Sequence, residues 1–208
     1  MRRTTILAIL LSVAIPFAAD ESRAQECDSP DGRATCPEAP TKGCSVSATS
    51  TLRIVKSPDG QDSRLAWTFG WGNGAPSQSS FGNPTVDTSY SLCIYDGEAL
   101  RMNGSVPANP SLWSAIGTTG YKYAEASASE GLGSIKLQSG PDAEVSMSLK
   151  GRGAGLPLPD AAEAGVHYFD PKNPVTLQWR VNGGACWSST FAPKTVVTND
   201  GSTYEAKF

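Results

Sequence analysis

The sequence predicts an all-β protein, an antiparallel two-sheet β-sandwich of the jelly-roll or Ig-like kind. Apolar and polar side chains alternate in segment after segment, and this period of two is typical of half-buried strands. The chain holds 21 Gly and 15 Pro, which favour many turns between short strands. The sequence shows no sustained helical stripe. Together these observations favour short strands over helices.

Residues 1–24 predict a secretory signal peptide. Arg2 and Arg3 precede an apolar stretch that ends at Ala19, and a small-residue cleavage site ends at Ala24. The apolar stretch is too short for a spanning helix, which needs about 20 residues. We therefore expect a secreted or periplasmic protein with no transmembrane segment after cleavage.

Residues 25–47 predict a Cys/Pro-rich leader with almost no large apolar side chain. Such a stretch cannot bury a core, so we expect it to be poorly ordered or held only by a local disulfide. Its cysteines, Cys27, Cys36 and Cys44, allow one internal pair, which leaves one thiol free or paired elsewhere. Glu26 stands where lipid attachment to Cys27 requires a small residue, so we do not expect lipidation.

Residues 48–208 predict the sandwich itself, because the alternation runs through them. The expected strands cover residues 52–55, 64–69, 90–95, 100–102, 135–137, 144–150, 175–181, 185–191 and 203–208. Asn103-Gly104 is typical of a turn, and Asn182-Gly183-Gly184 is typical of a hairpin. Residues 111–117 suit one helical turn or a loop wedge that carries Trp113. The connections 70–84 and 151–174 are long, and long loops on a sandwich often carry binding sites.

Cys93 and Cys186 lie on two strong strands of an exported chain, so we expect a disulfide between them. Paired or facing strands bring Cα atoms within the roughly 4.4–6.8 Å that such a bridge needs. The alternative is two buried free thiols.

A longer pattern of motifs resembles a known family. From Cys44 to about Ala192 the chain is similar to a family of secreted β-domains of unknown function that is abundant in myxobacteria and related environmental bacteria. The resemblance is carried by LRIVKSPDGQDSRLAWTFGWG, FGNPTVDTSYSLCIYDG, GYKYAEASASEGLGSIKLQSG, SMSLKGRGAGLPLP and PVTLQWRVNGGACWSSTF. It implies a bacterial secreted β-fold and no catalytic residue. Many relatives carry an extra cysteine pair in the loop VPANPSLWSAIG, which has none here.

Loop aromatics are the candidate binding residues. Exposed aromatic rings can stack on sugar rings, although burial at the ends of a sandwich is their more frequent fate. The candidate ligand-stacking residues are Trp71, Phe81, Trp113, Tyr121 and Tyr123.

Catalytic and metal-binding patterns are weak. His167 is the only histidine, and a serine nucleophile needs both a base and an orienting group. Asp87, Asp96 and Glu98 flank strand ends and could serve glycoside hydrolysis, but they suit turns equally well. Cysteine and carboxylate spacings match no zinc or calcium motif. We therefore predict no catalytic residue, no metal and no cofactor.

The charge balance bears on partners. Seventeen Lys and Arg against twenty Asp and Glu give a net charge of −3, and binding to nucleic acid needs a clustered basic surface. We therefore expect no nucleic-acid partner, and a glycan or another envelope component is the candidate ligand. The favoured role is a non-catalytic binding or envelope-associated module. The alternatives are a carbohydrate-active enzyme that uses loop carboxylates and a structural extracellular protein.

Overall fold

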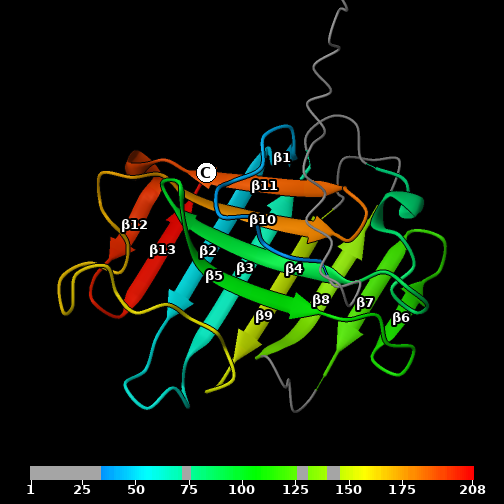
Figure 1. The fold of residues 1–208 in the computed structure, drawn as a ribbon, viewed down its shortest axis with the longest axis horizontal. Coiled ribbons are helices and arrows are strands. Elements are labelled where there is room, and N and C mark those ends of the chain that lie inside the picture. The colour runs from blue at the N-terminus through cyan, green and yellow to red at the C-terminus, as the bar shows by residue number, and fades with distance from the viewer. Residues whose placement is uncertain (1–33, 72–75, 126–130, 140–145) are drawn as a thin grey trace, which may run out of the picture.

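The computed structural model describes residues 34–71, 76–125, 131–139 and 146–208 (Figure 1). These residues form thirteen strands and two short 3-10 turns, η1 (Gln78–Phe81) and η2 (Pro193–Thr195). The strands make two sheets that pack face to face, so the predicted all-β sandwich is confirmed. The strand pairs in both sheets are antiparallel except that of β1 with β11, which is parallel.

One sheet has five strands and the other has eight. The smaller follows the order β1 (Ser45–Val46), β11 (Cys186–Phe191), β10 (Val175–Val181), β4 (Tyr90–Asp96) and β5 (Ala99–Val106). The larger follows the order β12 (Val196–Asn199), β13 (Thr203–Lys207), β2 (Thr49–Val55), β3 (Arg64–Gly70), β9 (Ser146–Arg152), β8 (Leu132–Gln138), β7 (Gly120–Ala124) and β6 (Trp113–Ile116). Figure 1 shows the smaller sheet in front, with its strands crossing those of the larger sheet.

The core lies between the sheets and follows from the period of two. In β3, Leu65, Trp67 and Phe69 are buried, whereas Arg64 and Thr68 on the other face are exposed. Successive side chains of a strand point to opposite faces of the sheet. A strand with apolar side chains on one face and polar side chains on the other therefore turns its apolar face toward the core. Each large apolar side chain that is fully buried in this way stabilises the fold by about 1.5–3 kcal/mol.

The predicted turn at Asn103-Gly104 is wrong, because β5 runs straight through both residues. The chain reverses earlier, at Gly97, whose φ of 59° suits a tight turn. Gly104 is buried against the other sheet, where an added Cβ would approach Leu132 Cδ1 to 3.1 Å. The glycine therefore permits a close approach of the two sheets instead of a reversal.

Residues 111–117 also differ from expectation. Residues 113–116 form strand β6 at the edge of the larger sheet, paired with β7, and neither a helical turn nor a loop wedge. Trp113 points into the core, and its indole N–H donates to the carbonyl of Pro107 at 3.2 Å. The predicted hairpin at Asn182-Gly183-Gly184 is confirmed, since it joins β10 to β11.

The leader is not separate from the sandwich over its described residues, 34–47. This segment lies over the outward side of the smaller sheet, and β1 at its end joins that sheet. Gln178 of β10 accepts from the Thr41 N–H at 3.0 Å and donates to the Thr41 carbonyl at 2.8 Å. The Tyr95 hydroxyl donates to the Pro37 carbonyl at 3.1 Å. The segment thereby buries the second face of β4, and it is not held by a local disulfide.

The expected disulfide between Cys93 and Cys186 is wrong. Cys93 is bonded to Cys36, and Cys186 is bonded to Cys44. Strand β10 lies between β4 and β11, which separates the two predicted partners by about two strand spacings, roughly 9.6 Å. That exceeds the distance of about 7 Å that a disulfide can span. Cys27 lies outside the described residues, as does the predicted signal peptide.

Candidate functional site

Three of the five candidate aromatics are core residues. Phe81, Trp113 and Tyr123 are buried. The Phe81 ring centroid lies 5.4 Å from that of Trp187, and those of Trp113 and Tyr123 lie 5.1 Å apart. These rings seal the core at one end of the sandwich, so the prediction that they stack on a ligand is wrong.

The other two candidates, Trp71 and Tyr121, are half-buried and pack against the core cluster. The Trp71 ring centroid lies 4.6 Å from that of Phe69 and 6.2 Å from that of Trp187. A large ring beside an apolar sandwich end gains more from burial than from exposure to water. The five aromatics therefore do not form an exposed stacking patch in the part of the chain that the structure describes.

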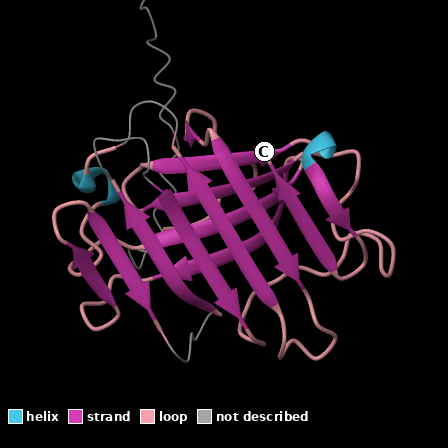
Figure 2. Cartoon of the chain, turned by 180° about the vertical axis from the view of Figure 1, so that it is seen from behind, coloured by secondary structure: helices cyan, strands magenta, loops and turns pink. Residues whose placement is uncertain are grey.

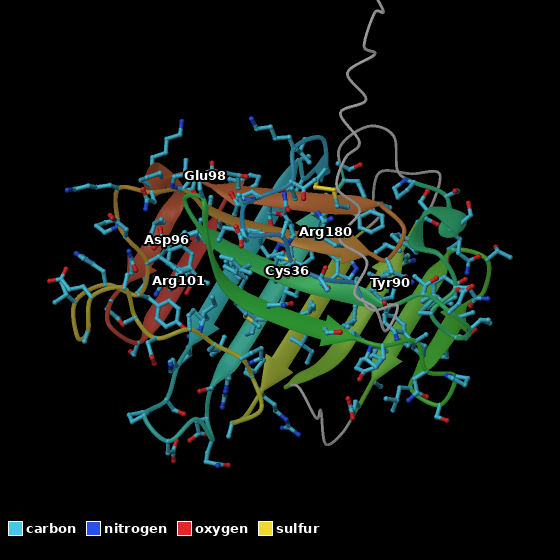
Figure 3. All side chains as sticks on the ribbon, in the orientation of Figure 1. Cys36, Tyr90, Asp96, Glu98, Arg101 and Arg180 are labelled. Atoms are coloured by element: carbon cyan, nitrogen blue, oxygen red, sulfur yellow. A yellow bond between two sulfur atoms is a disulfide. The ribbon has the colours of Figure 1, made fainter. Side chains whose placement is uncertain are left out.

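The structure places the candidate carboxylates at opposite ends of β4. Asp87 precedes β4 and Asp96 ends it, so their Cα atoms are separated by the length of the strand, about 20 Å or more. Asp96 is buried, and its Oδ2 accepts the Asp170 backbone N–H at 2.9 Å. Glu98 is exposed in the turn that follows, at the end of β4 opposite Tyr90 (Figure 3). Carboxylates that cleave glycosides face each other about 5–10 Å apart across a substrate.

His167 does not lie beside a described nucleophile. It borders a hollow of about 370 Å³ together with Glu163, Asp170 and Lys172, and its Nδ1 lies 3.2 Å from the Asn199 carbonyl oxygen. Neither serine nor cysteine lines this hollow. Among the described residues, groups of His, Cys, Asp and Glu that could hold a metal ion are also absent. This geometry supports neither nucleophilic nor metal-assisted chemistry at His167.

The outward face of the eight-stranded sheet is the feature that sequence reasoning missed. Its strands place Lys and Arg at positions that point away from the core, and Figure 2 shows this sheet nearest the viewer, with neither helix nor loop drawn over it. The outward cations are Arg53, Arg64, Lys122, Lys136, Lys150, Arg152 and Lys207. We call this surface the cationic face.

Carboxylates are nearly absent from the strands of the cationic face. Their sequences contain a single Asp or Glu, namely Glu205 of β13. Its Oε2 lies 3.6 Å from Arg53 Nε. Among the described residues, Lys56 also pairs with Asp160, at 2.6 Å, just beyond the end of β2. The positive charges of the face are therefore poorly compensated within the described chain.

Strand register places two like-charged pairs directly opposite each other. Arg64 of β3 faces Arg152 of β9, and Lys122 of β7 faces Lys136 of β8. Residues paired in this way have Cβ atoms about 4.5–5.5 Å apart, and like charges at that distance destabilise a sheet. Lys150 lies between the two pairs, two positions along β9 from Arg152. These five side chains form a diagonal row across four adjacent strands, which we call the cationic row.

Two grooves run along the cationic face beside this row. Ala66 of β3 is opposite Arg53 on one side and Lys150 on the other, so a methyl group between long side chains leaves a hollow. The larger groove, about 770 Å³, is lined by thirteen residues that include Asp62, Arg64, Ala66, Glu125, Lys150 and Arg152. The smaller, about 460 Å³, is lined by Arg53, Val55, Asp62, Arg64 and Ala66. The shared lining shows that the grooves adjoin.

The net charge does not predict the cationic face, and the expectation of no nucleic-acid partner stays a prediction. The overall charge of −3 is a sum over the whole chain. Strand pairing places the cations of six strands, β2, β3, β7, β8, β9 and β13, on one face of the larger sheet. The alternation in the sequence does point Arg53, Arg64 and Lys150 outward. It does not reveal that β3, β9, β8 and β7 are neighbours, and so it could not predict the cationic row.

No protein-family model, no curated protein and no solved structure matches the chain. The resemblance to the secreted β-domain family stays a prediction. Within the described ranges, the chain contains no helix of the length and hydropathy needed to span a bilayer.

Proposed function

We propose that this chain is a secreted, non-catalytic binding module that recognises an anionic polymer with its cationic face. One observation carries the proposal, namely the two like-charged pairs Arg64–Arg152 and Lys122–Lys136. Such pairs cost stability in an isolated sheet. Anionic groups held between the paired cations would remove that cost, so the arrangement suits a protein that carries a polyanion.

Export is supported by the cysteines. Both disulfides of the described chain tie the N-terminal segment to the smaller sheet, and bridges of this kind persist in oxidising compartments. The predicted signal peptide leads to the same compartment. The two outer surfaces of the sandwich then differ in use: the disulfide-linked segment covers one, and the cationic face is left open to a ligand (Figures 1 and 2).

The test measures binding to dextran sulfate, a soluble polyanion, by isothermal titration calorimetry. The binding variant replaces Arg64, Lys150 and Arg152 by Gln. A matched control replaces three exposed cations that lie off the cationic face, Lys42, Lys172 and Lys194, by Gln. Both variants change the net charge equally. We expect the binding variant to lose at least about tenfold in affinity, about 1.4 kcal/mol, and the control to lose less than about twofold.

Salt provides a second readout, because contacts between exposed charges weaken as ionic strength rises. Native chain and control should lose affinity together as salt increases, whereas the binding variant should respond less. If the substitutions in the binding variant and in the control reduce the affinity for dextran sulfate equally, binding depends only on the net charge of the chain. Either that result or an absence of dextran sulfate binding at low salt would overturn the proposal.

A further inference from the structure

We propose that the ligand of the cationic face is a linear acidic polysaccharide, whose chain lies along the cationic row from the Arg64–Arg152 pair to the Lys122–Lys136 pair. This inference rests on the proposed function and narrows it to one class of polymer. It depends on the length of the row, on the chemistry between its cations, and on two carboxylates that border it.

The length of the cationic row requires a polymer. The centres of the two pairs are separated by two strand spacings and by four residues along a strand, which gives roughly 17 Å. Lys150 lies near the middle, so positive charge recurs about every 8 Å along the row. A single anion or a monosaccharide reaches one pair only. An extended chain with repeated acidic groups can reach all five cations.

The side chains between the cations are small and polar. Ser134 and Ser148 stand at outward positions of β8 and β9, and Thr68 stands next to them on β3. Their hydroxyl groups can hydrogen-bond to sugar hydroxyls. Aromatic residues are absent from outward positions of the described strands of this sheet, so bases of a single-stranded nucleic acid have no ring to stack on. The same lack removes the aromatic anchors that a peripheral membrane protein inserts into lipid.

Two carboxylates in the larger groove distinguish a sugar from other polyanions. Asp62 is exposed, and Glu125, which accepts a hydrogen bond from the Tyr123 hydroxyl, is half-buried. Toward a phosphate or sulfate these carboxylates are repulsive. Toward a sugar hydroxyl they are acceptors of strong hydrogen bonds. A groove with cations for acidic groups and carboxylates for hydroxyl donors matches an acidic sugar, which carries both.

Asp62 provides the discriminating variant, because its carboxylate makes neither a hydrogen bond nor an ion pair with another described residue. Charge alone predicts that Asp62→Asn strengthens binding to every polyanion, since it removes a negative charge. The proposal predicts that Asp62→Asn weakens binding to polygalacturonate at least about threefold while leaving or increasing binding to single-stranded DNA. Glu98→Gln serves as the matched control, because Glu98 is exposed on the turn between β4 and β5, outside this sheet.

The full experiment uses isothermal titration calorimetry with polygalacturonate, neutral dextran, single-stranded DNA and vesicles of anionic phospholipid, at matched concentration of charge. We expect polygalacturonate to bind at least about tenfold more tightly than DNA or vesicles, and dextran not to bind. Affinity for oligogalacturonates should rise with chain length until the oligomer spans roughly 17 Å, the length of the row. Lys122→Gln/Lys136→Gln should remove the gain given by the longer oligomers and leave short-oligomer binding unchanged.

Failure of this inference is separable from failure of the proposed function. If DNA or vesicles bind as tightly as polygalacturonate, or if Asp62→Asn strengthens polygalacturonate binding, the polysaccharide assignment is overturned while a polyanion-binding face stands. If dextran sulfate does not bind at low salt, the proposed function itself is overturned.

Discussion

At the scale of single residues, one polar cluster joins the two sheets inside the core. The Trp67 indole N–H lies 3.1 Å from the Ser50 hydroxyl oxygen and 3.2 Å from that of Ser189. Ser50 donates to Ser189 at 2.9 Å. Ser50 and Trp67 belong to the larger sheet, and Ser189 belongs to β11 of the smaller one. Buried polar groups need partners, so this cluster sets how the sheets align across the core.

Ser189→Ala should lower the free energy of unfolding by about 1–3 kcal/mol, because it removes a buried hydrogen-bond partner of Trp67 and Ser50. Urea denaturation followed by tryptophan fluorescence measures the change. Ser114→Ala, at an exposed position of β6, should change it by less than about 0.5 kcal/mol. Equal effects of the two substitutions would show that the cluster does not stabilise the fold.

Trp113→Ala should lower the free energy of unfolding by about 3–5 kcal/mol, the usual cost of deleting a buried tryptophan. Trp113 is only 2 % exposed and contacts the rings of Tyr90 and Tyr123. Calorimetric melting measures the loss. A ligand-stacking surface residue could be removed with almost no loss of stability, so a melting temperature unchanged from the native chain would contradict the core position of Trp113.

At the scale of elements, the N-terminal segment behaves as part of the smaller sheet. It follows the outward side of β4 and β10, where Ser91, Gln178 and Arg180 bond to its backbone or side chains. The β4 strand is therefore buried along both faces. Local composition predicts that a Pro-rich, apolar-poor segment cannot form a core. It does not show that two cross-links and a row of hydrogen bonds can hold such a segment on a sheet.

Peptide mapping without reduction should recover the Cys36 peptide linked to the Cys93 peptide, and Cys44 linked to Cys186. Cys36→Ala/Cys93→Ala should then cost about 2–5 kcal/mol of unfolding free energy. The Cys36–Cys93 disulfide closes a loop with a sequence separation of 57. Its removal raises the conformational entropy of the unfolded chain and so stabilises the unfolded state. A linked Cys93–Cys186 peptide in native material would contradict the order of β4, β10 and β11.

At the scale of the whole molecule, the two outer surfaces of the sandwich are unequal. One is covered by the N-terminal segment, and the other is cationic and uncovered by any described helix or loop, although the chain as a whole is acidic. The interior holds several tyrosines whose ionisation the fold suppresses. Burial raises the pKa of Tyr95 to about 12, against the opposing effect of the Arg180 charge. Burial likewise raises the pKa of Tyr90, Tyr168 and Tyr204.

This predicts that stability falls above about pH 10, the unperturbed tyrosine pKa. The folded state holds these protons to higher pH than the unfolded state does. Their contribution to stability is therefore complete below that pH and is lost as the pH rises through about 12, the raised pKa of Tyr95. Urea denaturation at increasing pH measures the loss. Tyrosine absorbance should show the four buried phenols ionising only as the chain unfolds; ionisation near the ordinary pKa in the folded chain would contradict their burial.

The class of the fold follows from the amino-acid pattern alone, because period-two alternation is a local property that does not depend on which strands are neighbours. Leu65, Trp67 and Phe69 had to share a face, and Arg64 had to lie on the other, whatever β3 paired with. The hairpin at residues 182–184 was also readable, since two strands joined by a tight turn are neighbours by necessity.

Which strands lie side by side depends on packing between distant parts of the chain. The position of β10 between β4 and β11 separates Cys93 from Cys186, and the order β3, β9, β8, β7 assembles the cationic row. These pairings join residues far apart in the chain, where many strand orders satisfy the same alternation. Asn103-Gly104 illustrates the limit at one point: the dipeptide favours a turn locally, but the approach of Leu132 from the opposite sheet accounts for the glycine. Packing against distant residues overrides local preference, and the candidate binding face depends on that packing.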